Sequence, residues 1–169
     1  MEQIEMYTDL HTHSRASDGT LKPEELVKYA KEAGLASAAL TDHDTVDGIE
    51  EFMDAGKRLK IETIPGIELA SAYKNTELRI VGLFIDYKSR ALTESMEYIV
   101  GERNERNAKM LKALARCGIE ITIDELNENA AGGIITRAHY ANVMVNKGYV
   151  KTRGEAFDKY ISSGRPGYV

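Results

Sequence analysis

Three of the four histidines in the chain lie close to carboxylate residues, at spacings that suit the binding of a metal ion. His11 and His13 form a His-Thr-His sequence, and side chains two residues apart in an extended segment point the same way. His43 lies within Thr41-Asp-His-Asp44, between two aspartates. Neutral imidazoles and carboxylates together suit zinc, manganese or iron, so these sequences predict a site for such a divalent metal.

Two further carboxylates complete the candidate set. Asp18 lies in Ser17-Asp-Gly19, a turn-prone sequence that can direct its carboxylate back toward the histidines. Glu68 follows Pro65-Gly-Ile, where a strand is expected to end. Several carboxylates without cysteine are also consistent with two metal ions that share one bridging ligand. We therefore expect metal ligation by His11, His13, Asp18, His43 and Glu68.

Each of these residues also has an interpretation that needs no metal. A single His-x-His sequence is weak evidence for a metal site, and Asp18 alone is typical of a turn. Asp42 and Asp44 could cap the helix that follows them, and Glu68 could pair with a surface lysine. The shared position of the set at the ends of predicted strands is what favours the metal site.

The segments that carry these residues alternate between extended and helical patterns. Strands are predicted at 6–10, 36–40, 61–67 and 78–85, and helices at 23–33 and 46–59. Pro23 in the first turn and Gly34 after the last turn mark the first of these helices. The alternation predicts an α/β fold with parallel strands, in which ligands bind beyond the carboxyl ends of the strands.

The second half of the chain is predicted to be helical. A long helix is expected over 92–114, an extended segment over 119–123, and shorter helices over 124–129, 137–147 and 153–161. We therefore divide the chain into 1–88 with the metal site, 89–165 as a helical insertion subdomain, and 166–169 as the start of a connector.

Composition narrows the classes of protein that need to be considered. A net charge of −5 argues against broad electrostatic binding to nucleic acid or membrane, although a local basic pocket for phosphate stays open. Cys117 is the only cysteine, so an internal disulfide is excluded, and we expect a packed thiol. The sequence has no apolar run of about 18 residues and no signal-peptide core, so a cytoplasmic location is expected.

Taken in order, the motifs resemble those of the PHP (polymerase and histidinol phosphatase) family, above all its small bacterial phosphoesterases. Those include 3′,5′-nucleoside bisphosphate phosphatases and 5′-to-3′ exonucleases. The matching sequences are Asp9-Leu-His-Thr-His-Ser14, Ser17-Asp-Gly19, Thr41-Asp-His-Asp-Thr45, Gly66-Ile-Glu68, Leu83-Phe-Ile-Asp86, Thr136-Arg-Ala-His139, Lys147-Gly-Tyr149, Glu155-Ala-Phe157 and Pro166-Gly-Tyr-Val169.

The resemblance implies a distorted (β/α)7 barrel and two or three divalent metal ions, manganese, zinc or iron. His11, His13 and Glu68 would share one ion, and Asp18, His43 and Glu68 the second, with Glu68 as the bridge. The implied reaction is hydrolysis of phosphate monoesters or terminal phosphodiesters of nucleotides or oligonucleotides. The alternative is a non-catalytic metal-binding or nucleotide-binding fragment, or a regulatory module.

One departure from the family pattern concerns a single side chain. The family places a histidine in the strand after the bridging glutamate, where this chain has Arg79. A guanidinium has no lone pair for a metal, so a third ion is in doubt there and we expect Arg79 to contact substrate phosphate instead. Alternation along the strand would also allow Arg79 to point outward.

A second departure concerns the family ligands that normally follow the helical insertion. A Gly-His-Pro-like histidine and a final Asp-x-His do not occur here, which favours the non-catalytic alternative for the isolated chain. The five retained ligands favour the enzyme for the intact protein. A barrel of this type needs roughly 200 residues or more. We therefore expect a partial barrel with the first four strands, from a truncated protein or a gene fragment. Its exposed sheet edge would permit self-association.

The helical half contains candidate phosphate ligands. Arg103 and Arg106 interrupt the apolar stripe of the long helix, one turn apart, and could hold a phosphate by charged hydrogen bonds. His139 lies near a predicted helix start, where free amide hydrogens favour anions, and resembles a family position that contacts substrate phosphate. The alternatives are solvated arginines and a partly buried structural histidine.

Overall fold

The computed structural model describes residues 6–74 and 76–169. The chain divides into two compact units, Met1–Met96 and Glu97–Val169, and each is described by itself. The boundary falls within the helix α3, Arg90–Ala115. The division into 1–88, 89–165 and 166–169 stays a prediction. Across the described residues, no helix combines the length and apolar character needed to cross a membrane.

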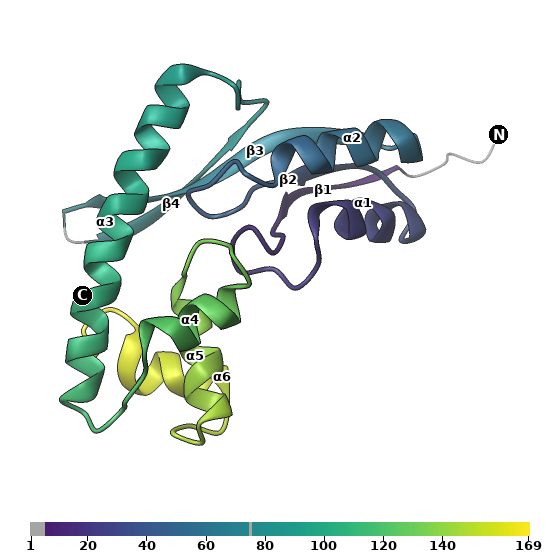
Figure 1. The fold of residues 1–169 in the computed structure, drawn as a ribbon. Helices are drawn as coiled ribbons and strands as arrows, with labels where there is room; N and C mark the ends of the chain where they lie inside the picture. The colour runs from purple at the N-terminus through teal and green to yellow at the C-terminus, as the bar shows by residue number, and fades with distance from the viewer. Residues whose placement is uncertain (1–5, 75) are drawn as a thin grey trace. The chain divides into compact units, whose positions relative to one another are not determined.

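The first unit is an α/β unit built on a curled four-stranded half-barrel, as the sequence predicts (Figure 1). Its elements in chain order are β1 Tyr7–Thr12, α1 Pro23–Glu32, β2 Leu35–Leu40, α2 Ile49–Leu59, β3 Glu62–Tyr73 and β4 Thr76–Leu83. The strand order in the sheet is β1-β2-β3-β4, so each strand lies beside its neighbour in sequence. β1, β2 and β3 run parallel and are connected through α1 and α2.

The fourth strand corrects the expectation of a wholly parallel sheet. β4 pairs with β3 in the antiparallel direction, from Gly66 opposite Leu83 to Tyr73 opposite Thr76. A parallel neighbour would need a crossover of a dozen or more residues, whereas Tyr73 and Thr76 are close enough in sequence only for a hairpin. β3 also continues well past the expected end at residue 67, which leaves no room for a crossover.

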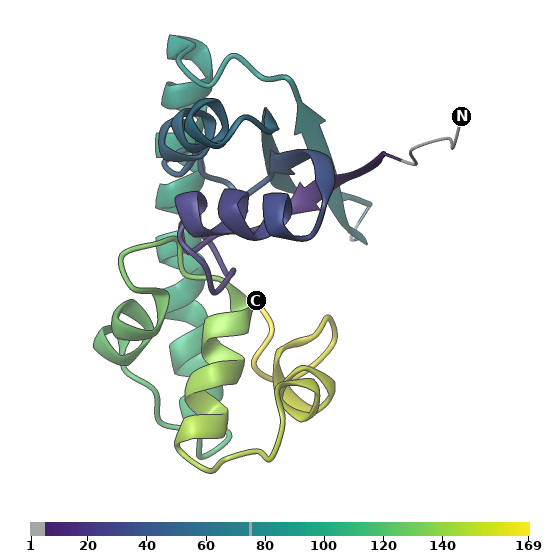
Figure 2. The ribbon, with the colours of Figure 1, turned by 90° about the vertical axis from the view of Figure 1, so that its right-hand side faces the viewer.

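The core of the first unit lies between the sheet and the two helices. α1 and α2 pack against each other, and they pack against β2 and β3 from one face of the sheet (Figure 2). Right-handed crossovers between parallel strands place both helices on that side. Val27 of α1, Leu40 of β2 and Phe52 of α2 are fully buried in this layer. The packing of the two helices therefore fixes the positions of the parallel strands relative to one another.

The second unit is helical, as the sequence predicts. After α3 come α4 Ile123–Ala130, α5 Arg137–Asn146, α6 Arg153–Ala156 and the π-helical turn η1 Phe157–Ile161. The core of this unit includes the fully buried Met110, Leu126 and Tyr140. Residues 119–122, all within the described range, form an irregular connection and not the extended segment expected there. Cys117 is exposed in the turn after α3, so the expectation of a packed thiol is wrong.

A close approach between α2 and β3 gives the first testable prediction. A Cβ atom on Gly56 would lie 2.3 Å from Thr63 Oγ1, so alanine would force the helix off the strand. We expect Gly56→Ala to reduce the free energy of unfolding by about 1–3 kcal/mol, measured by urea denaturation. Gly101 in α3 is the matched control, because a Cβ there meets no atom within 4 Å. Gly101→Ala should stabilise by about 1 kcal/mol, and equal losses in both variants would contradict the packing account.

Candidate metal centre

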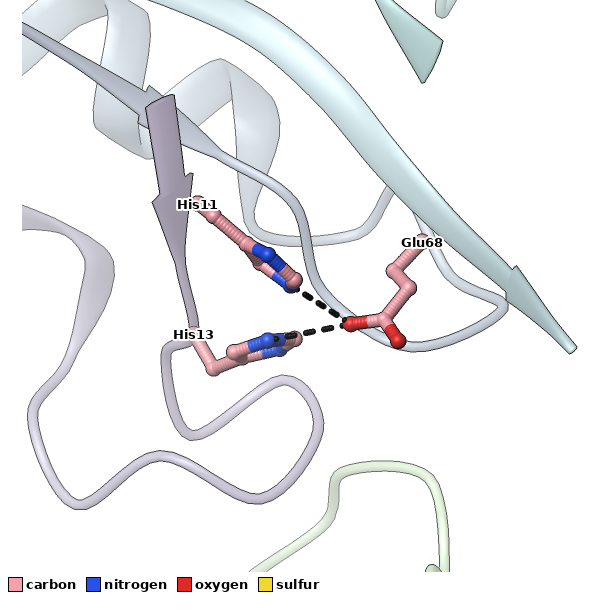
Figure 3. Close-up of side chains that lie close together, drawn as sticks. All are labelled: His11, His13 and Glu68. Atoms are coloured by element: carbon pink, nitrogen blue, oxygen red, sulfur yellow. Dashed lines mark hydrogen bonds and ion pairs between the residues drawn. The ribbon is translucent and has the colours of Figure 1, made fainter. Parts of the chain in front are cut away.

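Two histidines from the end of β1 converge on one carboxylate of β3. His11 Nε2 lies 2.7 Å from Glu68 Oε2, and His13 Nε2 lies 3.2 Å from the same oxygen. Figure 3 shows both imidazoles pointing at the Glu68 carboxylate across the space between the two strands. His11 is half exposed, whereas Glu68 is buried. The two histidines point the same way because they are two residues apart in an extended segment.

The other two candidate ligands meet beside this cluster. His43 Nε2 lies 3.5 Å from Asp18 Oδ2, and His43 Nδ1 lies 3.5 Å from Glu68 Oε2. His13 stands between the two halves, with its ring centroid 4.5 Å from that of His43 and its Nδ1 3.8 Å from Asp18 Oδ1. The structure therefore brings all five candidate ligands together.

The backbone holds two of these ligands side by side. His43 and Glu68 form a parallel β-bridge beyond the end of β2. In this bridge Glu68 N donates to the Asp42 carbonyl (3.1 Å), and Asp44 N donates to the Glu68 carbonyl (3.0 Å). The Asp44 carboxylate then accepts a hydrogen bond from Ala70 N (2.8 Å). α2 begins later, with Gly48 as its N-cap, so the alternative that Asp42 and Asp44 cap this helix is wrong.

The loop between His13 and Asp18 is closed by a tight backbone approach. Gly19 N donates to the Ser14 carbonyl (2.9 Å), which draws the end of the loop back onto its start. A Cβ on Gly19 would lie 2.1 Å from the His13 carbonyl oxygen, so only glycine fits. The Ser-Asp-Gly sequence thus places the Asp18 carboxylate beside the histidines.

The donor set fits a divalent transition metal. His11, His13 and Glu68 form one group, and His13, Asp18 and His43 form another, each with one ligand atom per residue within 4.8 Å of the others. His13 Nδ1 is buried, and among the described residues it has no hydrogen-bond partner. A buried ring nitrogen without a hydrogen-bond partner is an atom that a bound metal ion would satisfy. Which residues share each ion stays a prediction.

Burial decides the protonation of His43. Loss of hydration is the largest effect on its pKa and lowers it, because the charged imidazolium is disfavoured away from water. The carboxylates of Asp18 and Glu68 raise the pKa, while His13 and Arg79 lower it, and the net pKa is below the ordinary value. A neutral ring keeps the lone pair that a metal requires.

Arg79 of β4 lies at this cluster. Its Nη1 donates to His43 Nδ1 (3.0 Å) and lies 3.9 Å from Glu68 Oε1, while its Nη2 pairs with Glu77 Oε1 (2.9 Å). The side chain is 36% exposed, so the guanidinium contacts the cluster and still reaches solvent. The alternative in which Arg79 points away from the cluster is therefore wrong.

The remaining candidates belong to the second unit. Arg103 is buried and donates to the Ile135 carbonyl (3.2 Å), and Arg106 donates to Asn107 Oδ1 (3.2 Å). The alternative of a fully solvated pair is therefore wrong for Arg103. His139 is buried in the first turn of α5, where its Nδ1 accepts a hydrogen bond from Thr136 N (3.0 Å).

Sequence reasoning missed one polar residue of this region. The Asp42 carboxylate is buried and contacts the side chains of Ser14 and Ser17, far away in the sequence. One indication of this contact was present in the sequence, because Ser14 directly follows His13 and Ser17 directly precedes Asp18. Serine hydroxyls next to two candidate ligands need an acceptor, and Asp42 supplies it.

Comparisons with known proteins identify a matching family and related sequences. Residues 9–154 match the family model of the PHP domain. A 5′-3′ exoribonuclease of Escherichia coli is 36% identical over 165 residues, which cover 95% of this chain and 56% of that protein. A 3′,5′-nucleoside bisphosphate phosphatase of Chromobacterium violaceum is 37% identical, over 95% of this chain and 57% of its own length. The chain thus spans a little over half the length of these relatives.

Two solved structures superpose on almost the whole of this chain. An amidohydrolase from Chromobacterium violaceum, solved with bound sulfate and no metal, superposes with a TM-score of 0.87 at 37% identity, over 96% of this chain and 57% of that one. A protein from Bifidobacterium adolescentis, described as a metal-dependent phosphoesterase, superposes with a TM-score of 0.89 at 26% identity. That match covers 99% of this chain and 59% of the other.

The lowered pKa of His43 predicts how the metal-free protein responds to acid. As the pH falls through about 6.5, the unfolded chain takes up the His43 proton before the folded chain does, so stability falls. Above that pH both states are neutral at this ring, and the effect vanishes. We expect His43→Gln to flatten the loss of stability between about pH 7 and pH 5, measured by urea denaturation in EDTA. Equal slopes for variant and wild type would show that the pKa is not lowered.

Proposed function

The chain belongs to the PHP domain family, and on that premise we propose that it is a divalent-metal-dependent phosphoesterase. Its substrates would be phosphate monoesters or terminal phosphodiesters of nucleotides or oligonucleotides. The observation that carries the proposal is that two groups of candidate metal ligands meet at His13, and that one of them includes the buried Glu68. The names of the two relatives, an exoribonuclease and a nucleoside bisphosphate phosphatase, support the substrate class.

In this proposal five side chains of the first unit hold two ions, manganese, zinc or iron. The ligands would be His11, His13, Asp18, His43 and Glu68. Glu68 would be the bridge, as the family resemblance implies, and its Oε2 lies near a ring nitrogen of each of the three histidines. When bound there, divalent ions would supply Lewis-acid chemistry, which lowers the pKa of a water and neutralises charge on the phosphate. Glu68 supports this role because a buried carboxylate requires cationic partners. His43 supports it because its lowered pKa keeps its ring neutral.

Arg79 would bind the substrate phosphate directly. Its contact with Glu77 fixes one edge of the guanidinium, and its partial exposure leaves donors accessible from solvent. Arginine stays charged at all working pH values and offers several donors in a fixed plane, which suits phosphate oxygens. In this role Arg79 supplies a permanent positive charge where the family resemblance implies a metal-binding histidine.

Arg103, Arg106 and His139 are proposed as further phosphate ligands within the second unit. Two arginines one turn apart on α3 and a histidine in the first turn of α5 are groups that favour an anion. We also propose a cytoplasmic location, since the chain carries a single cysteine. The open edges of the sheet at β1 and β4 would permit self-association.

A combined binding and activity assay tests the function. We expect the chain to bind Mn²⁺ and to release inorganic phosphate from a nucleoside 3′,5′-bisphosphate, or nucleotides from a 5′-phosphorylated oligonucleotide. Glu68→Gln should lower Mn²⁺ affinity by at least about tenfold, because it removes a shared charged ligand. Asp54→Asn, at an exposed carboxylate paired with Lys57, is the matched control and should change neither quantity.

The outcomes separate the proposed enzyme from its alternative, a non-catalytic metal-binding or nucleotide-binding module. The Arg79 contact with His43 is the observation that favours this alternative, because it engages a candidate ligand. Binding of Mn²⁺ and nucleotide without hydrolysis would support the module. A chain that binds no divalent metal would refute the proposed enzyme, and a chain that also binds no nucleotide would refute the module as well.

Replacing Arg79 tests whether it stands in for a metal ion. Arg79→His restores a potential ligand beside His43 and Glu68, so we expect the chain to bind up to one additional equivalent of Mn²⁺. Metal content after equilibration and desalting, measured by elemental analysis, gives the stoichiometry. Arg79→Lys keeps the positive charge but does not add a metal ligand, so this variant should bind the same amount of Mn²⁺ as the wild type. Unchanged stoichiometry in Arg79→His would mean that Arg79 does not stand in for a metal.

A further inference from the structure

The Asp42 carboxylate lies at the centre of a buried network. It is 2% exposed and accepts three hydrogen bonds, from Ser14 N (2.8 Å), Ser14 Oγ (2.6 Å) and Ser17 Oγ (2.6 Å). Both serines are themselves buried. Charge-assisted hydrogen bonds of this length are the strong class, and a buried carboxylate without them would be costly. The network is therefore a fixed part of the first unit.

The serines place this network at both ends of one loop. Ser14 directly follows His13, and Ser17 directly precedes Asp18. Ser17 N also donates to the Ser14 carbonyl (3.1 Å), so the loop closes around the carboxylate. A single side chain thus determines the path of the chain between two candidate metal ligands.

The backbone of Asp42 connects the same network to the other ligands. Its carbonyl accepts the hydrogen bond from Glu68 N (3.1 Å), and the next residue is His43. Asp42 therefore joins the His13–Asp18 loop through its side chain and the His43–Glu68 bridge through its main chain. These two connections set the distance between Asp18 and His43, whose Oδ2 and Nε2 atoms are 3.5 Å apart.

We propose that Asp42 is a positioning residue, which acts through Ser14 and Ser17 to hold Asp18 within reach of the metal beside His13 and His43. This inference rests on the proposed function, since it concerns the same metal centre. Residues that orient metal ligands by hydrogen bonds typically change metal affinity by 10–100-fold when they are replaced. Asp42 makes no contact with the metal in this role.

The test compares Asp42→Asn with the wild-type chain in Mn²⁺ titrations followed by electron paramagnetic resonance. Asparagine has nearly the same shape, but its amide nitrogen donates and cannot accept. One of the two oxygens that accept from the serines is therefore lost, and the loop loses part of its anchor. We expect Mn²⁺ affinity to fall by about 10–100-fold. Asp54→Asn again serves as the matched control with unchanged affinity. Wild-type affinity in Asp42→Asn would overturn the proposal.

A double-mutant cycle separates positioning from general loss of structure. Ser17→Ala removes one of the three hydrogen bonds and should weaken Mn²⁺ binding less than Asp42→Asn does. In the double variant the loss should be smaller than the sum of the two single losses, because both changes weaken the same network. Fully additive losses would show that Asp42 acts by another route. If Asp42→Asn does not fold, the Mn²⁺ affinity of Ser17→Ala alone tests the proposal. Wild-type affinity in Ser17→Ala would then overturn it.

A metal-free measurement distinguishes failure of this inference from failure of the proposed function. In EDTA, amide hydrogen exchange at Ser14, Ser17 and Gly19 should be at least about tenfold faster in Asp42→Asn, with exchange in α1 unchanged. Unchanged exchange in the loop would overturn the anchoring role of Asp42. A wild-type chain that binds no Mn²⁺ would instead refute the proposed function, and the exchange data would still decide whether Asp42 holds the loop.

Discussion

Two backbone hydrogen bonds extend the parallel pairing of β2 with β3 beyond the last residue of β2. They join Glu68 to the carbonyl of Asp42 and to the amide of Asp44, so that His43 lies directly beside Glu68. Without this bridge His43 would belong to a free loop after β2. The rest of the candidate centre is attached to the bridge, because the Glu68 carboxylate receives the histidines of β1. The Asp42 carboxylate holds the loop that carries the remaining aspartate.

The meeting of His11, His13 and Glu68 could be predicted from the sequence. Parallel strands bring their carboxyl ends to one edge of a sheet. His11 and His13 are at the end of β1, and Glu68 comes just after Pro65, where the pairing of β3 with β2 ends. The role of Asp42 could not be predicted in this way. Its partners lie 25 and 28 residues away, and nothing in its own neighbourhood specifies which hydroxyl groups its carboxylate will meet. Contacts of this kind depend on how a loop closes in three dimensions.

The direction of β4 is a second feature that could not be predicted from the sequence. An alternating apolar pattern identifies a strand but is the same whichever way the strand runs. The length of β3 was the missing information, since a strand that continues to Tyr73 can connect to β4 only by a hairpin. The antiparallel direction has a chemical consequence. It places Arg79 opposite Ala70, two residues beyond Glu68, and so delivers a permanent positive charge to the cluster of histidines.

The same topology determines the order in which the chain can assemble its polar cluster during folding. The β3–β4 hairpin closes the shortest loop in the sheet, so its entropic cost of closure is the lowest. The parallel pairings of β1 with β2 and of β2 with β3 each require a crossover helix first. His11 and Glu68, 57 residues apart, can meet only after both crossovers are complete. Contact between these two side chains therefore reports that β1, β2 and β3 have reached their native order in the sheet.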